Sequence, residues 1–113
     1  MKKLTSGNSL LLKSLPKITA QIVKHYQPEQ IVLFGSLAEG KKMANDIDLF
    51  LIKNTKIKRH IDRVRKVRKI LPDELPIDLI IYTPQEVEKS LEIGSYFVED
   101  ILKQGKVLYE AKK

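Results

Sequence analysis

The sequence contains no cysteine and no tryptophan, and only 6% of its 113 residues are aromatic. Without cysteine there are no disulfides, no thiolate metal sites and no cysteine nucleophile. No apolar run is long enough to span a bilayer, and the three leucines at 10–12 are too few for a signal peptide. We therefore expect a cytoplasmic protein with no membrane segment.

Acidic residues are also scarce, with 14 Asp and Glu against 21 Lys and Arg, and the net charge of +7 favours an anionic substrate or partner. A length of 113 residues suits one domain with a modest core. We see no repeat, linker or low-complexity tract. The chain is therefore predicted to consist of a flexible N-terminal arm over residues 1–13 and one domain over residues 14–113.

Apolar periodicity and turn residues predict alternating helices and strands in this domain. The Thr83-Pro84-Gln85-Glu86 segment is a capping box with proline at the first helical position. The fold class is α/β or α+β: a small mixed sheet flanked by helices, mostly on one side. The expected helices cover about residues 16–26, 58–71, 84–93 and 96–104, and the expected strands cover 30–34, 49–52, 77–82 and 106–109.

Two carboxylates, Asp46 and Asp48, stand at the head of the second strand. Side chains alternate along a strand, so both should point to one face while Ile47 and Leu49 point to the other. Two adjacent anions repel each other, and a hard divalent cation with oxygen ligands offsets that repulsion. We interpret Asp46 and Asp48 as Mg2+ ligands.

Gly35-Ser36 follows the first strand directly. A glycine turn there can present backbone N–H groups and a hydroxyl to a phosphate. A third carboxylate, Asp78, opens the strand at 77–82 and can join the pair if the two strands are neighbours. Three carboxylates around two metal ions suit phosphoryl or nucleotidyl transfer, and one of them can accept the proton of the attacking hydroxyl.

The predicted helix at 58–71 has Ile61, Val64, Val67 and Leu71 predicted to point inward. Its predicted outer face is strongly basic and consists of Lys58, Arg59, Arg63, Arg65, Lys66, Arg68 and Lys69. Such a face is either solvated or docks an acidic partner or RNA. Nucleic acid is the less favoured partner because no aromatic residues are interleaved for base stacking. His25 and His60 are isolated and receive no role.

The order and spacing of these residues resemble the signature of the polymerase-beta-type nucleotidyltransferase superfamily. The matching pattern is Gly35-Ser36, nine further residues, Asp46-Ile47-Asp48, and then Asp78 on a later strand. The short length and the closing segment 97–110 are similar to its minimal nucleotidyltransferase branch. The resemblance implies a polymerase-beta-like fold. It also implies ATP phosphates at Gly35 and Ser36, Mg2+ at Asp46, Asp48 and Asp78, and assistance to deprotonation from Asp78.

The resemblance further implies a partner. Members of this branch are commonly antitoxins that transfer AMP from ATP to a tyrosine of a HEPN-type ribonuclease toxin. The sequence departs from the family pattern at Glu39, where arginine is common, and at Asn45, where serine is common. Glu39 places a negative charge near the expected phosphates unless it points outward or Lys41 and Lys42 offset it.

Two function classes stay open. The first is a Mg2+-dependent protein adenylyltransferase that modifies a partner toxin. The second is a non-catalytic antitoxin that neutralises its toxin by forming a complex and keeps a vestigial nucleotide site. With 113 residues there is no room for an acceptor domain, so either the acceptor is a protein or a homo-oligomer builds the cleft.

Overall fold

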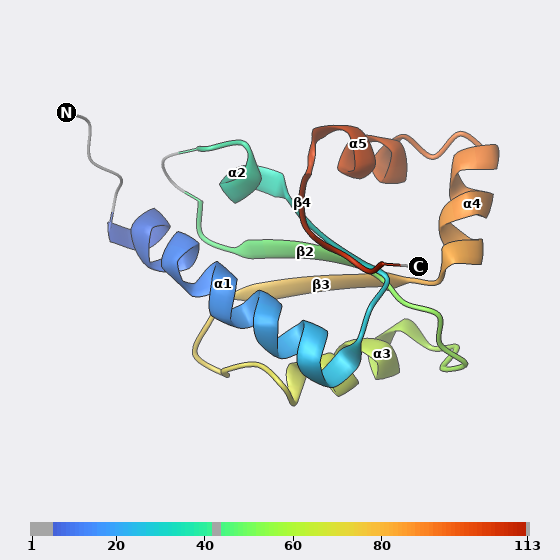
Figure 1. Ribbon diagram of the computed structural model, residues 1–113. Helices are drawn as coiled ribbons and strands as arrows, with labels where there is room; N and C mark the ends of the chain where they lie inside the picture. The colour runs from blue at the N-terminus through green and yellow to red at the C-terminus, as the bar shows by residue number, and fades with distance from the viewer. Residues whose placement is uncertain (1–5, 42–43, 113) are drawn as a thin grey trace.

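The computed structural model describes residues 6–41 and 44–112, and its centre is a four-stranded sheet with the order β3-β2-β1-β4 (Figure 1). Strand β1 runs antiparallel to both β2 and β4, and β2 runs parallel to β3. The mixed α/β fold expected from the sequence is therefore confirmed. The elements in chain order are α1 (Ser6–Tyr26), β1 (Gln30–Phe34), α2 (Gly35–Ala38), β2 (Ile47–Ile52), α3 (His60–Arg68), β3 (Ile77–Tyr82), α4 (Pro84–Glu92), α5 (Tyr96–Gln104) and β4 (Lys106–Glu110).

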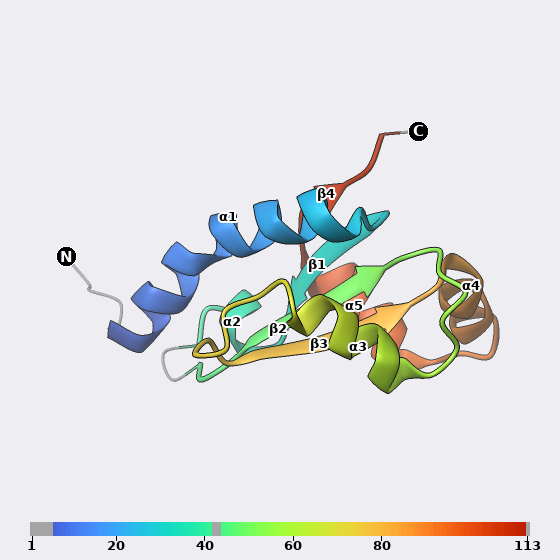
Figure 2. The ribbon, with the colours of Figure 1, turned by 90° about the horizontal axis from the view of Figure 1, so that it is seen from below.

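Helices cover both faces of the sheet, with α1 and α3 on one face and α4 and α5 on the other (Figure 2). Along β2, Ile47 and Leu49 belong to the core on the α1 side, whereas Phe50 belongs to the core on the α4 and α5 side. The expectation of helices mostly on one side was wrong. The continuous apolar run Leu49–Ile52 of this central strand needs cover on both faces.

Helix α1 begins at Ser6, so most of the predicted N-terminal arm is helical. Leu11 is buried together with Leu15, Ile18 and Ile22, which extends the apolar stripe one turn upstream. Pro16 lies inside the helix rather than at its start. An interior proline costs about 3 kcal/mol, and burial of the leucines on the preceding turn offsets that cost. Residues 1–5 of the predicted arm lie outside the described residues.

Helix α3 is shorter than predicted and is rotated relative to the prediction. Val67 is fully buried and Leu71 is buried beyond the helix end, as expected, but Ile61 is 45% exposed. Arg63, assigned to the outer basic face, is instead 5% exposed. The apolar periodicity of this segment is too weak to fix its rotation, because Arg63, which is buried and paired with the partly exposed Glu86, takes one of the inward positions.

That contact covers the free edge of β3. His60 Nε2 accepts a hydrogen bond from the backbone N–H of Ile81 at 3.1 Å, and Arg63 donates to the Ile81 carbonyl at 3.0 Å. Arg63 also donates to the Ile57 carbonyl at 2.7 Å and forms two hydrogen bonds with Glu86 at 2.7 and 3.2 Å. Exposed strand edges invite pairing with other chains. Two side chains of α3 therefore satisfy the backbone N–H and C=O groups of Ile81 on this edge.

The remaining local predictions agree with the structure. Thr83 and Glu86 form the reciprocal capping box at the start of α4, and Ser95 caps α5. Strands β3 and β4 lie where the sequence placed them. Within the described ranges, no helix is both long and apolar enough to cross a membrane.

Candidate nucleotidyl-transfer site

Gly35 is held in a conformation that few other residues adopt, directly after β1. Its φ is +77°, which disfavours any residue with a side chain. A Cβ at this position would collide with the Oδ2 atom of Asp48. From this glycine the chain enters the short helix α2, in which Ser36 is exposed and Leu37 is buried. The glycine therefore lets the backbone approach a carboxylate that a side chain would push away.

Asp48 and Asp78 lie directly opposite each other on neighbouring parallel strands. The antiparallel pairing of β1 with β2 places Phe34, the residue before Gly35, opposite Asp48 on the other side. The glycine turn and two carboxylates therefore converge at one end of the sheet, across three adjacent strands. Asp46 precedes β2 and is exposed, and Asp78 is also exposed, whereas Asp48 is half-buried.

Burial and the neighbouring carboxylates both disfavour ionisation of Asp48. The pKa of Asp48 is raised from 3.8 to about 6, first by burial and then by the charge of Asp78 and a hydrogen bond with it. The charge of Asp46 makes the smallest contribution. The repulsion expected between these anions is present, and its strongest source is the neighbour on β3 rather than the neighbour in sequence.

The donor chemistry here is suited to a hard cation. Carboxylate oxygens are the ligands that Mg2+ prefers, and a pair of touching carboxylates gains from a positive charge between them. In the part of the chain that the structure describes, no three His, Cys, Asp or Glu side chains are gathered tightly enough to hold a metal ion. The arrangement therefore offers two candidate metal ligands, Asp48 and Asp78, with Asp46 nearby.

A small hollow of about 220 Å3 opens beside Gly35, between α2 and α5. Glu39, Phe97 and Asp100 contribute to its lining. Glu39 is exposed, and its carboxylate pairs with Lys41 at 3.5 Å. Of the two lysines predicted to offset this charge, Lys41 does so, while Lys42 lies outside the described residues.

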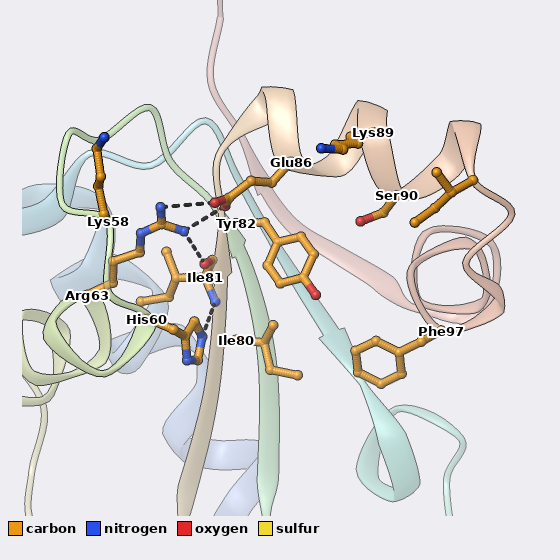
Figure 3. Close-up of a pocket in the computed structure, with 11 residues that line it drawn as sticks. Lys58, His60, Arg63, Ile80, Ile81, Tyr82, Glu86, Lys89, Ser90 and Phe97 are labelled. Atoms are coloured by element: carbon orange, nitrogen blue, oxygen red, sulfur yellow. Dashed lines mark hydrogen bonds and ion pairs between the residues drawn. The ribbon is translucent and has the colours of Figure 1, made fainter.

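A larger groove of about 570 Å3 lies further along β3 and was not foreseen from the sequence (Figure 3). Ile80 and Tyr82, which share the strand face of Asp78, form part of its floor, and Phe97 borders it from α5. The Arg63–Glu86 pair crosses one end. The spacing of His60 and Arg63, three residues apart on one helix face, was the only signal for their joint role.

Comparisons with known proteins agree with this geometry. The family described as "Polymerase beta, Nucleotidyltransferase" matches residues 16–113. No curated protein matches the chain. Among solved structures, the crystal structure of a candidate nucleotidyltransferase from Sulfolobus solfataricus shares the fold, with a TM-score of 0.67 and 20% identity over 100% of this chain and 95% of that one. The family match spans α1 from Pro16 onward, the glycine turn and all three aspartates, so the chain belongs to the polymerase beta nucleotidyltransferase family.

Proposed function

We propose that this protein transfers AMP from ATP to a hydroxyl of a partner protein and so acts as the antitoxin of a HEPN-type toxin. Family membership supports nucleotidyl transfer in general. The finer assignment draws on the resemblance to the minimal nucleotidyltransferase branch. The observation that carries the proposal is the close approach of the Gly35 backbone to Asp48, which itself lies opposite Asp78. This approach places the proposed phosphate-binding turn beside the carboxylate pair.

Each residue has a defined task in this reaction. The backbone N–H groups at the start of α2 have no partners within the helix, so with the Ser36 hydroxyl they can hold phosphate oxygens. Asp48 and Asp78 would hold Mg2+, with Asp46 as a further ligand, and the ion would supply positive charge to the triphosphate. The attacking oxygen forms a bond to the α-phosphorus, the bond to the bridging oxygen breaks, and pyrophosphate leaves. Asp78 accepts the proton of the attacking hydroxyl.

A tyrosine is the acceptor that we propose. A phenol has an unperturbed pKa of about 10, well below that of an aliphatic hydroxyl, so a carboxylate base removes its proton more easily. The carboxylates at the heads of β2 and β3 are exposed or half-exposed, which leaves them accessible to a loop of another protein. Orientation of that loop would supply much of the rate, because in-line geometry converts a bimolecular step into a unimolecular one.

The test is transfer to the protein encoded by the adjacent gene, in the presence of ATP and Mg2+. Mass spectrometry should detect one or more AMP units on a partner tyrosine. Asp48→Asn should abolish the modification, while Asp73→Asn, the same chemical change at an exposed carboxylate in the loop before β3, should leave it intact. Calorimetric titration of ATP should give measurable affinity with Mg2+ and much weaker affinity with EDTA.

The non-catalytic antitoxin remains the second candidate function. It is favoured by the lack of a ready three-ligand group among the described residues and by Glu39 at the rim of the hollow beside Gly35. A partner that is inhibited in a tight complex but carries no AMP would decide for this alternative. Equal ATP affinity with Mg2+ and with EDTA would contradict the metal assignment.

A further inference from the structure

The groove shown in Figure 3 begins close to the carboxylate site and runs away from it along β3. Asp78, Ile80 and Tyr82 are alternate residues of this strand, so their side chains share one face of the sheet. Ile80 lines the groove and lies two residues from Asp78, which is roughly 7 Å along a strand. Phe97 lines both the groove and the hollow beside Gly35. The groove therefore adjoins the proposed transfer site.

The strand order determines the side from which an acceptor can reach the α-phosphorus in the proposed reaction. The turn at Gly35, at the end of β1, would hold the phosphates that leave as pyrophosphate. The attacking oxygen must enter in line with the leaving group and opposite to it. Because β2 lies between β1 and β3, the opposite side is that of β3, which is an edge strand. The acceptor therefore approaches across the strand that carries Asp78 and the groove.

One wall of the groove is a face of α4 continued by the first turn of α5. The residues that α4 and its C-cap contribute are spaced as on one helix face, at Glu86, Lys89, Ser90 and Ile93. Ile93 is 76% exposed and Phe97 is 50% exposed. Large apolar side chains that reach solvent together mark interaction surfaces, and aromatic residues are enriched there. This wall therefore offers an apolar contact to a partner.

The charge of the lining favours an acidic partner. Three cations line the groove, Lys58, Arg63 and Lys89, against one carboxylate, Glu86. Arg63 and Glu86 pair with each other at 2.7 Å. Both lysines are exposed, and the ion pairs among the described residues include neither of them. Figure 3 shows them on either side of the Arg63–Glu86 pair. Two cations beside an apolar wall are complementary to a segment that has carboxylates around an apolar side chain.

We propose that this groove binds an acidic segment of the acceptor protein and so positions the acceptor hydroxyl at Asp78. An apolar side chain of that segment packs against Ile93 and Phe97, and its carboxylates lie beside Lys58 and Lys89. The inference rests on the proposed function, because the in-line geometry of transfer places the acceptor on the side of β3. Docking of this kind supplies the orientation on which the rate of transfer depends.

Charge reversal at the two lysines tests the docking. The groove variant is Lys58→Glu/Lys89→Glu, and the matched control is Lys66→Glu/Lys69→Glu, the same change of charge at exposed lysines that do not line the groove. The probe is the purified protein encoded by the adjacent gene, with binding measured by biolayer interferometry. The Kd should rise by about tenfold or more in the groove variant, because like charges then meet, and by less than about twofold in the control.

An uncharged variant tests the apolar wall. Ile93→Ser should also raise the Kd for the adjacent-gene protein, without any change of charge. Circular dichroism should show that this variant and the groove variant are folded like the parent. In transfer assays, both should raise the KM for the acceptor protein and leave kcat and the KM for ATP unchanged.

The outcomes separate docking from transfer. Binding that depends on Lys58, Lys89 and Ile93 but gives no AMP transfer would support the docking and contradict the proposed function. Transfer with an unchanged KM for the acceptor in both variants would overturn the docking and leave the proposed function standing. A raised KM for ATP would assign the groove to the nucleoside and overturn the docking, and so would a parent protein that does not bind the adjacent-gene protein.

Discussion

Replacing Asp48 with asparagine measures what it costs to hold a carboxylate beside Asp78. Asparagine has nearly the same shape and can still donate a hydrogen bond to Asp78, but it carries no charge. In the native protein the pKa of Asp48 is raised from 3.8 to about 6 by burial, by Asp78 and, least, by Asp46. The ionised form is therefore disfavoured by folding, and Asp48→Asn should be more stable than the parent at neutral pH.

The size of the gain follows from the shift. Each pKa unit corresponds to about 1.4 kcal/mol, so a shift of roughly two units is at most about 3 kcal/mol. Solvent screens a half-buried carboxylate, and we expect about 1–2 kcal/mol to remain. In a domain of this size that raises Tm by roughly 4–10 °C. The measurement is thermal unfolding in EDTA at pH 8.

The stability gained by Asp48→Asn should depend on pH in one direction only. Because the folded pKa of Asp48 lies above the unfolded value, the parent loses stability as pH rises from 3.8 through about 6, and the full penalty applies above that range. The gain from Asp48→Asn should be present at pH 8 and absent near pH 3.5. The control Asp46→Asn should change Tm much less, since Asp46 is exposed. An equal gain at both pH values, or a loss at pH 8, would refute the reasoning.

Three further predictions concern neighbouring features. Gly35→Ala should abolish nucleotide binding and transfer. The control Gly94→Ala, at a glycine with the same φ of +77° but open space around its Cβ, should cost only about 1–2 kcal/mol of stability. Equal transfer in both variants would contradict the close approach of Gly35 to Asp48. Arg63→Met should lower the free energy of unfolding by about 2–4 kcal/mol in denaturant titrations, with a smaller loss once Glu86→Gln is also present. Glu39→Arg should tighten ATP binding by about 1–3 kcal/mol in calorimetry, and an unchanged affinity would mean that Glu39 stays turned toward solvent.

Local chemistry made several features predictable from the sequence. The capping box at Thr83 depends on residues three apart, so no distant contact is needed to specify it. The apolar run at Ile77–Tyr82 specified a strand because its length and branched residues suit no other buried element. The side-chain alternation that separates Asp48 from Ile47 and Leu49 follows from strand geometry alone.

Only the tertiary structure decided which elements become neighbours. The sequence left open whether β3 pairs with β2, and it is that pairing which sets Asp78 opposite Asp48 and raises its pKa. The collision that makes Gly35 indispensable also involves a residue on another strand.

The rotation of α3 was equally beyond local prediction. Arg63 turns inward and Ile61 turns outward because β3 is an edge strand with unpaired backbone groups. The free carbonyl of Ile81 accepts a hydrogen bond from the Arg63 guanidinium, and this bond stabilises the inward position of the arginine. The sequence predicts the period of a helix. Which face is buried depends on the surface that it meets, and that surface is assembled from residues far away in the chain.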